Sequence, residues 1–113
     1  MSIIVDLATA TICFSAGCFP ALVGSDTPRG SYQLVQYATK QRGLGGDILV
    51  FKETKTDLYA IHRLIDVPKQ DRRSRIKSKD PKIRQITAGC INVDDVTYKK
   101  IIDCCKASTL IIR

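Results

Sequence analysis

The stretch Thr87-Ala88-Gly89-Cys90-Ile91-Asn92-Val93 places a cysteine after a glycine, at the end of one predicted strand and just before a helical pattern. The segment from Asp94 to Cys105 is the one convincing helix. Asp94 and Asp95 favour its start, because an acidic side chain there caps free amides and opposes the helix dipole. Its apolar residues fall on roughly one face. They are Val93, Tyr98, Ile101, Ile102 and Cys105.

Upstream of this stretch, short apolar runs alternate with turn residues, which predicts strands. The expected strands span residues 1–12, 18–23, 31–37, 47–52 and 58–65, with a last one at 110–112. Thr27-Pro28-Arg29-Gly30 is a turn signal. A chain of 113 residues fits one domain, 1–113. Many short strands with one helix predict a mainly β fold, a sandwich or barrel-like domain.

One segment holds most of the charge. Between Lys69 and Arg84 lie eight basic and two acidic residues, so this segment carries +6 of the net +7. We interpret residues 68–84 as an inserted basic loop. Its concentrated charge either attracts polyanions or belongs to a solvated loop. A nucleic-acid-binding module is the alternative from a different class, but the segment lacks interleaved aromatic residues, so we do not expect nucleic acid as a partner.

The cysteine pattern excludes some kinds of site. Five cysteines leave at least one thiol unpaired, and one histidine without a CxxC motif gives no zinc site. We expect no metal and no cofactor. We expect Cys13, Cys104 and Cys105 to lie in or near the core. We expect no disulfide between Cys13 and Cys18 and none between the adjacent Cys104 and Cys105.

Cys90 and His62 are a candidate nucleophile and base. A free thiol titrates near ~8.5, and a neighbouring imidazole can take its proton. His62 lies near the end of a predicted strand, and Gly89 before Cys90 lets backbone amides turn inward as an oxyanion hole. The alternative is a small buried cysteine and a hydrogen-bonded histidine without catalytic roles.

The order of the motifs resembles the L,D-transpeptidase catalytic domain, the YkuD-like family. The sequence reads DTPRGSY at residues 26–32, Ile61-His62 after a strand, and TAGCINV at residues 87–93. These segments are similar to the family's TPxGx[FY] turn, its IH pair, and its [ST]xGC motif followed by an apolar residue and Asn or Arg. Residues 3–9 and 20–24 resemble its first two strands, so the resemblance covers nearly the whole chain.

The resemblance implies a mixed β-sandwich with the cysteine in a groove and peptidoglycan tetrapeptide stems as substrate. The thiolate attacks the carbonyl of the third residue and releases the terminal D-Ala. An amine of a second stem then gives a 3→3 cross-link, while water gives L,D-carboxypeptidase action.

The resemblance also implies roles for individual residues. Cys90 is the nucleophile and His62 the base, and the backbone N–H groups of Gly89 and Cys90 form the oxyanion hole. Thr87 steadies the loop, while Asn92 holds loop geometry or binds substrate. Tyr32 lines up with the family's early motif and is more structural than catalytic. The basic segment is then a groove wall that binds stem-peptide carboxylates, an attachment to anionic envelope surfaces, or a solvated loop. If it contacts substrate, Arg63 and Arg84 are the best candidates, because they flank the catalytic elements.

Three departures from the family pattern stand out. Arg63 replaces a frequent Gly, Ala88 replaces a frequent His, and 24 residues separate His62 from Thr87, more than usual because of the basic segment. The family implies a periplasmic or cell-envelope location, although no signal peptide and no membrane-spanning stretch are visible. A secreted antibacterial effector that edits a rival's stem peptides, with an immunity protein as partner, is the variant interpretation.

Overall fold

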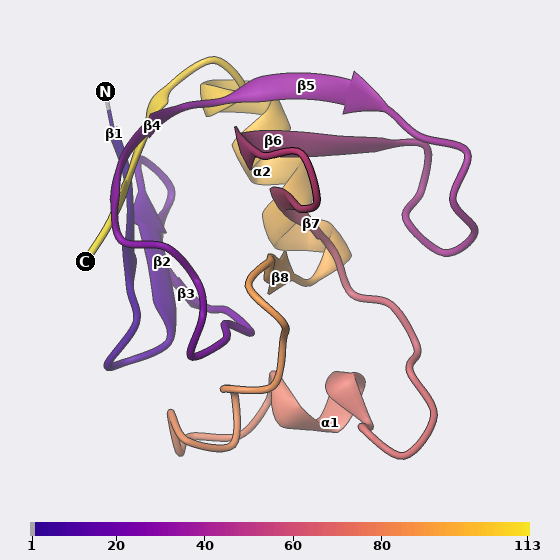
Figure 1. Cartoon of the computed structure of the whole chain (residues 1–113). Coiled ribbons are helices and arrows are strands. Elements are labelled where there is room, and N and C mark those ends of the chain that lie inside the picture. The colour runs from indigo at the N-terminus through magenta and orange to yellow at the C-terminus, as the bar shows by residue number, and fades with distance from the viewer. Residues whose placement is uncertain (1) are drawn as a thin grey trace.

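The computed structural model describes residues 2–113 and places nine strands and two helices in that range (Figure 1). The strands are β1 (Ser2–Asp6), β2 (Thr11–Phe14), β3 (Gly17–Pro20), β4 (Gly30–Gln33), β5 (Val35–Ala38), β6 (Asp47–Glu53), β7 (Leu58–Arg63), β8 (Ile91–Val93) and β9 (Thr109–Ile112). The helices are α1 (Arg72–Arg75) and α2 (Asp95–Cys105).

The strands form two mixed sheets that make a sandwich, which confirms the predicted fold class. One sheet has the order β3-β2-β1-β9-β4 and the other β5-β6-β7-β8. Two pairs are parallel, β1 with β9 and β7 with β8. In Figure 1 the indigo strands β1 and β2 stand apart from β5 and β6, and α1 lies at the far end of the molecule from β5.

A single core joins both sheets to α2. It is built mainly from Ile, Val and Leu, as strands with buried alternate residues require. Its fully buried members include Ile3, Ile12, Leu49, Ile61, Ile91, Tyr98, Ile101 and Leu110. The predicted start of α2 is confirmed, because the Asp94 side chain accepts a hydrogen bond from the Thr97 amide at 2.7 Å.

Two predicted strands are each divided in two. Of the strand expected at residues 1–12, Met1 lies outside the described residues. Residues 2–12 form β1, a turn and part of β2, because the Asp6 carboxylate binds the Thr9 amide at 3.1 Å and Ala10 takes a φ of 50°. Residues 31–37 divide at the buried Leu34, so that β4 joins one sheet and β5 the other. Periodicity alone does not reveal where a strand changes sheets.

The basic segment is folded, which corrects its interpretation as a loop. It contains α1, whose start is capped by the Asp71 side chain. Ile76 is buried in a small cluster with Leu22 and Leu64. Arg84 is also buried and donates hydrogen bonds to backbone carbonyls of the β1–β2 turn.

The cysteine pairing differs from expectation. Cys13 and Cys18 face each other across the β2–β3 hairpin and form a disulfide, because the turn at residues 15–16 sets them opposite one another with a Cα–Cα distance of 4.1 Å. Cys104 and Cys105 are also joined at the end of α2. Cys104 is exposed, not in the core.

Neither helix within residues 2–113 has the length and apolar character needed to cross a bilayer.

Candidate functional site

His62 and Cys90 are brought together by the parallel pair β7 and β8. His62 pairs with Asn92 in the register, so Cys90 lies just before β8 at the level of Ala60. Adjacent strands lie ~4.8 Å apart with a rise of ~3.3 Å per residue, which puts the Cα atoms of His62 and Cys90 roughly 8 Å apart. Both side chains line one cavity of about 250 Å³. The sheet therefore places a thiol and an imidazole on one wall of a shared hollow.

The Cys90 thiol is half-buried and is the one cysteine of the described chain outside a disulfide. Its Sγ lies 3.6 Å from the carbonyl oxygen of Leu58, to which the S–H donates. Burial raises the pKa of the Cys90 thiol, and the Ala60 amide and the positive charge of Arg72 oppose this only in part. The thiol is thus neutral near pH 7 and needs a base before it can attack.

The His62 ring is buried and held in one tautomer. Its Nδ1 lies 2.6 Å from the carbonyl oxygen of Arg63, which can only accept, so Nδ1 carries the proton and Nε2 keeps its lone pair. Burial lowers the pKa of His62, the hydrogen bond to Arg63 works in the opposite direction, and the charge of Arg72 lowers it further. The imidazole is therefore neutral near pH 7, and Nε2 is the nitrogen that can accept a proton, once the Asn92 amide that faces it at 3.3 Å gives way.

A chain of hydrogen bonds reaches His62 from the basic segment. Arg72 Nη1 donates to Asn92 Oδ1 at 2.9 Å, which turns the amide of Asn92 so that Nδ2 faces His62 Nε2 at 3.3 Å. Asn92 is completely buried. Arg72, which starts α1, lines the same cavity as Cys90. Sequence reasoning missed Arg72, since no local signal separates it from the other basic residues of its segment.

The loop before Cys90 is fixed by Thr87. Its hydroxyl donates to the Cys90 carbonyl at 2.6 Å and accepts from the Gly89 amide at 3.2 Å. Gly89 has a φ of +136°, and a Cβ there would lie 2.6 Å from the Tyr59 ring. Glycine is therefore required at this position. For the Gly89 amide to serve an oxyanion hole, it would have to exchange the Thr87 hydroxyl for a substrate oxygen.

Arg63 is not among the residues that line the cavity of His62 and Cys90, and its expected contact with substrate stays a prediction. Its Nη1 forms an ion pair with Asp47 at 2.9 Å and donates to the Leu44 carbonyl at 2.8 Å. Its guanidinium also lies 4.1 Å from the centre of the Tyr98 ring. These contacts join β6, β7 and α2 and commit the side chain to the fold, because alternate residues of β7 point to opposite faces.

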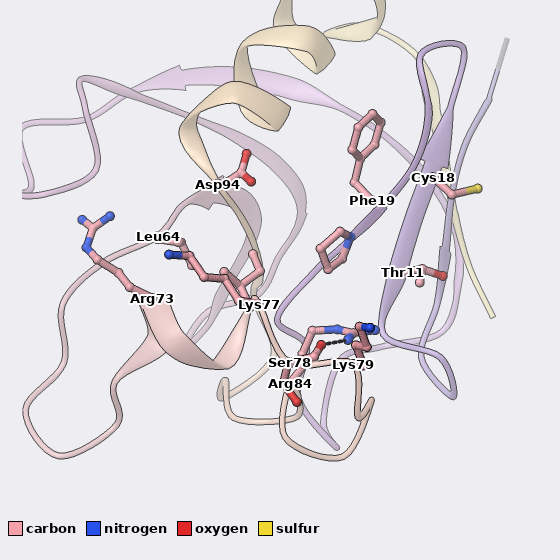
Figure 2. A pocket seen from close by; sticks show the side chains of 12 residues that line it. Thr11, Cys18, Phe19, Leu64, Arg73, Lys77, Ser78, Lys79, Arg84 and Asp94 are labelled. Atoms are coloured by element: carbon pink, nitrogen blue, oxygen red, sulfur yellow. Dashed lines mark hydrogen bonds between the residues drawn. The ribbon is translucent and has the colours of Figure 1, made fainter.

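Arg84 is likewise a structural residue. Its Nη2 donates to the Thr9 carbonyl at 2.7 Å and its Nε to the Ala10 carbonyl at 3.2 Å, while Nη1 bonds the Ser78 carbonyl. Figure 2 shows this last bond inside a second hollow, of about 570 Å³, which lies between the β2–β3 hairpin and the basic segment. Arg84 is thus separated from the thiol and is not assigned a contact with substrate.

The Tyr32 side chain contacts the turn that precedes β4. Its hydroxyl lies 3.1 Å from the Pro28 carbonyl and 2.9 Å from the Arg29 carbonyl, and its ring packs against Phe51. The side chain thereby closes the turn before β4, away from the cavity of Cys90.

Comparisons with known proteins find this fold in solved structures but find no match by sequence. No family model matches the sequence, and no curated protein matches it. Solved structures do match. An L,D-transpeptidase from Mycobacterium smegmatis aligns with a TM-score of 0.57 at 16% identity over 99% of this chain and 58% of that one. The L,D-transpeptidase (Yku) from Stackebrandtia nassauensis aligns with a TM-score of 0.62 at 14% identity over 99% and 54%.

Bd1075 from Bdellovibrio bacteriovorus aligns with a TM-score of 0.64 at 17% identity, over 99% of this chain and 47% of that one. The chain therefore spans about half the length of the solved proteins it matches. At these identities the likeness shows the fold: the two sheets and the helix α2 have the arrangement of the L,D-transpeptidases.

Proposed function

We propose that this chain is a cysteine acyltransferase of the L,D-transpeptidase type that acts on the tetrapeptide stems of peptidoglycan in the cell envelope. One observation carries the proposal. The one cysteine outside the described disulfides and the only histidine of the sequence line the same cavity, on a fold that L,D-transpeptidases share. Both groups are neutral near pH 7, which is the state that general-base activation of a thiol starts from.

The first half of the proposed reaction forms a thioester. Once the Cys90 thiol leaves the Leu58 carbonyl and replaces the Asn92 amide at Nε2 of His62, Nε2 takes its proton as Sγ attacks the carbonyl carbon of the third stem residue. The Cys90 amide, and the Gly89 amide once Thr87 releases it, stabilise the negative charge that develops on the oxygen. The C–N bond breaks, and His62 returns the proton to the amino group of the departing D-Ala.

The second half transfers the acyl group. An amine of a second stem, or a water molecule, attacks the thioester carbonyl and gives up a proton to His62. The C–S bond breaks and the sulfur leaves as thiolate, which recovers that proton from the imidazolium. An amine acceptor gives a cross-link, and water gives a stem shortened to the tripeptide. In each of these steps His62 is the group that takes up or returns the proton.

The test is incubation of the protein with purified disaccharide-tetrapeptide, followed by mass spectrometry. Wild type is expected to give tripeptide or cross-linked dimer, and Cys90→Ala and His62→Gln are expected to give neither. Thermal unfolding shows whether the variants keep the fold. Lys82→Met, which removes an exposed charge from the basic segment, is the control and should retain activity.

A carbapenem supplies a second measurement that does not depend on the acceptor. Because the proposed nucleophile forms acyl adducts, wild type should gain the mass of the β-lactam on the peptide that contains Cys90, and Cys90→Ala should not. Products from folded Cys90→Ala, or neither product nor adduct from folded wild type, would refute the proposal.

A further inference from the structure

The guanidinium of Arg72 has donors to spare. It carries five N–H groups, and its Nε donates to Gln70 Oε1 at 2.8 Å while Nη1 donates to Asn92 Oδ1 at 2.9 Å. Within residues 2–113, no acceptor contacts Nη2 and no carboxylate forms an ion pair with Arg72. Two hydrogen bonds therefore hold the guanidinium in place, and its Nη2 has no acceptor within the described residues.

The Arg72 side chain lies at the cavity that contains the thiol. Arg72, Cys90 and His62 line the same hollow, and the charge of Arg72 lowers the pKa of both Cys90 and His62. The carboxylate of Asp57 also lines the cavity, but it is exposed and accepts a hydrogen bond from the Thr56 hydroxyl at 2.9 Å. A half-buried guanidinium without an acidic partner favours an anionic ligand.

The neighbouring arginine shows that this placement is specific. Arg73 is exposed, forms an ion pair with Asp66 at 3.0 Å, and lines the separate hollow shown in Figure 2. Ile76 lines that hollow too. Of the arginines of α1, Arg72 is the one that lines the cavity with the thiol, and it also lines a neighbouring hollow beside Asp66 and Asp71.

We propose that Arg72 forms an anion subsite beside Cys90 that binds the terminal carboxylate of the leaving residue. This inference rests on the proposed function for the identity of the peptide. When Sγ attacks a peptide carbonyl, the carboxylate of the next residue lies one residue further along, within about 3.8 Å of chain. The fork of a guanidinium matches a carboxylate in shape as well as charge. The subsite selects peptides that end one residue after the attacked carbonyl.

The test measures binding in the Cys90→Ala background, where no turnover occurs. The probes are the disaccharide-tetrapeptide with a free terminal carboxylate and the same compound with a terminal amide. A charge-assisted hydrogen bond contributes ~1.5–3 kcal/mol, so the acid is expected to bind roughly ten- to a hundredfold more tightly than the amide. Adding Arg72→Gln should remove this preference, and Arg72→Lys should keep part of it.

Arg73→Gln in the same background is the matched control, because it removes the same charge one residue away, and its preference for the acid should be unchanged. Equal binding of acid and amide by Cys90→Ala, or a preference that survives Arg72→Gln, would overturn the inference. Failure of the proposed function gives a different result. In that case wild type turns over neither probe, while Cys90→Ala still prefers the acid to the amide and loses this preference with Arg72→Gln. Thermal unfolding of each variant identifies any loss that comes from misfolding.

Discussion

At the scale of single residues, the site depends on backbone groups as much as on side chains. The Arg63 carbonyl decides which nitrogen of His62 bears the proton, although the Arg63 side chain is occupied elsewhere. The Thr87 hydroxyl similarly holds the loop through the Cys90 carbonyl and the Gly89 amide. Replacing a side chain can therefore disturb the chemistry without removing a reacting atom.

Gly89→Ala tests this dependence on the loop. The new methyl group would lie 2.6 Å from the Tyr59 ring, and the φ of +136° is already unfavourable for alanine. Strained backbone of this kind costs about 1–3 kcal/mol. We expect Gly89→Ala to lower the free energy of unfolding by at least this amount and to reduce kcat by displacing Cys90. Urea titration and the tetrapeptide assay measure the two effects.

Gly46→Ala is the matched control for that experiment. Gly46 also has a positive φ, of +101°, but a Cβ there would meet no atom within 4 Å. It should therefore show the backbone penalty alone, with kcat near that of wild type. If the two variants lose the same stability and the same activity, the contact with Tyr59 does not position the nucleophile.

At the scale of elements, Arg84 holds the basic segment to the β1–β2 turn, and Arg75 joins two parts of the segment to each other. Arg75 donates to the Gln70 and Ile83 carbonyls at 2.7 and 2.9 Å, and Arg84 binds carbonyls of the turn. These guanidinium groups satisfy backbone oxygens that would otherwise be buried without a donor. The segment is thereby kept against the sheet with α1 and Arg72 at the cavity.

Arg84→Met tests whether this attachment stabilises the fold. Methionine preserves much of the apolar length but leaves the carbonyls of Thr9 and Ser78 without their donor, while the Ala10 carbonyl keeps the Ala21 amide. An unsatisfied buried group costs about 1–3 kcal/mol, so a loss of roughly 2–4 kcal/mol in the free energy of unfolding is expected. Lys82→Met removes the same charge from an exposed position and should change stability by less than about 0.5 kcal/mol.

A structural role and a substrate-binding role of Arg84 predict different results. If the role is structural, Arg84→Met lowers the free energy of unfolding and leaves the KM of the folded fraction unchanged. If Arg84→Met keeps the stability of wild type and raises KM, the side chain contacts substrate after all, as the sequence first indicated.

The elements also show what sequence can and cannot reveal. The apolar face of α2 and its acidic cap were predictable, because both depend on residues close together in the chain. The turn between β1 and β2 was missed because apolar residues continue through Leu7, Ala8 and Ala10. The disulfide between Cys13 and Cys18 was missed because it depends on the pairing of β2 with β3. Arg72 could not be singled out, since its place at the cavity follows from the burial of Ile76 and Arg84 in contacts distant in sequence.

At the scale of the whole molecule, the net charge of +7 is less available to partners than composition implies. Arg63, Arg72, Arg75 and Arg84 all donate to groups of the chain itself. The charges that remain open to solvent in the basic segment are mostly lysines. Composition indicated a field that attracts polyanions, but it could not distinguish a charge on the surface from one that holds the fold together.

The buried imidazole of His62 should make the stability of the whole chain depend on pH. Its pKa in the folded state lies below the ordinary value of 6.5, chiefly because of burial. Above pH 6.5 both the folded and the unfolded state hold it neutral, so its full contribution is present. As pH falls, the unfolded state binds the proton first, and the free energy of unfolding must decrease until the folded pKa is passed.

Two carboxylates with lowered pKa values, Asp47 and Asp6, affect the free energy of unfolding at a lower pH than His62 does. For Asp47 burial acts in the opposite direction, but hydrogen bonds from Gln36, Arg63 and Tyr98 outweigh it, and for Asp6 the backbone of Thr9 is the main cause. Their ordinary pKa is 3.8, so their contributions are lost only near and below that value. Between pH 7.5 and 5 the dependence should therefore come from His62 alone.

Urea unfolding of wild type and His62→Gln at pH 7.5, 6.5, 5.5 and 5.0 measures this dependence. Wild type should lose stability below pH 6.5, and His62→Gln should lose little over the same range, because glutamine does not titrate. An equal loss in both proteins would attribute the effect to repulsion among the positive charges and would contradict a buried, neutral imidazole. Since only a neutral imidazole can take the proton of Cys90, that result would also remove the base from the proposed reaction.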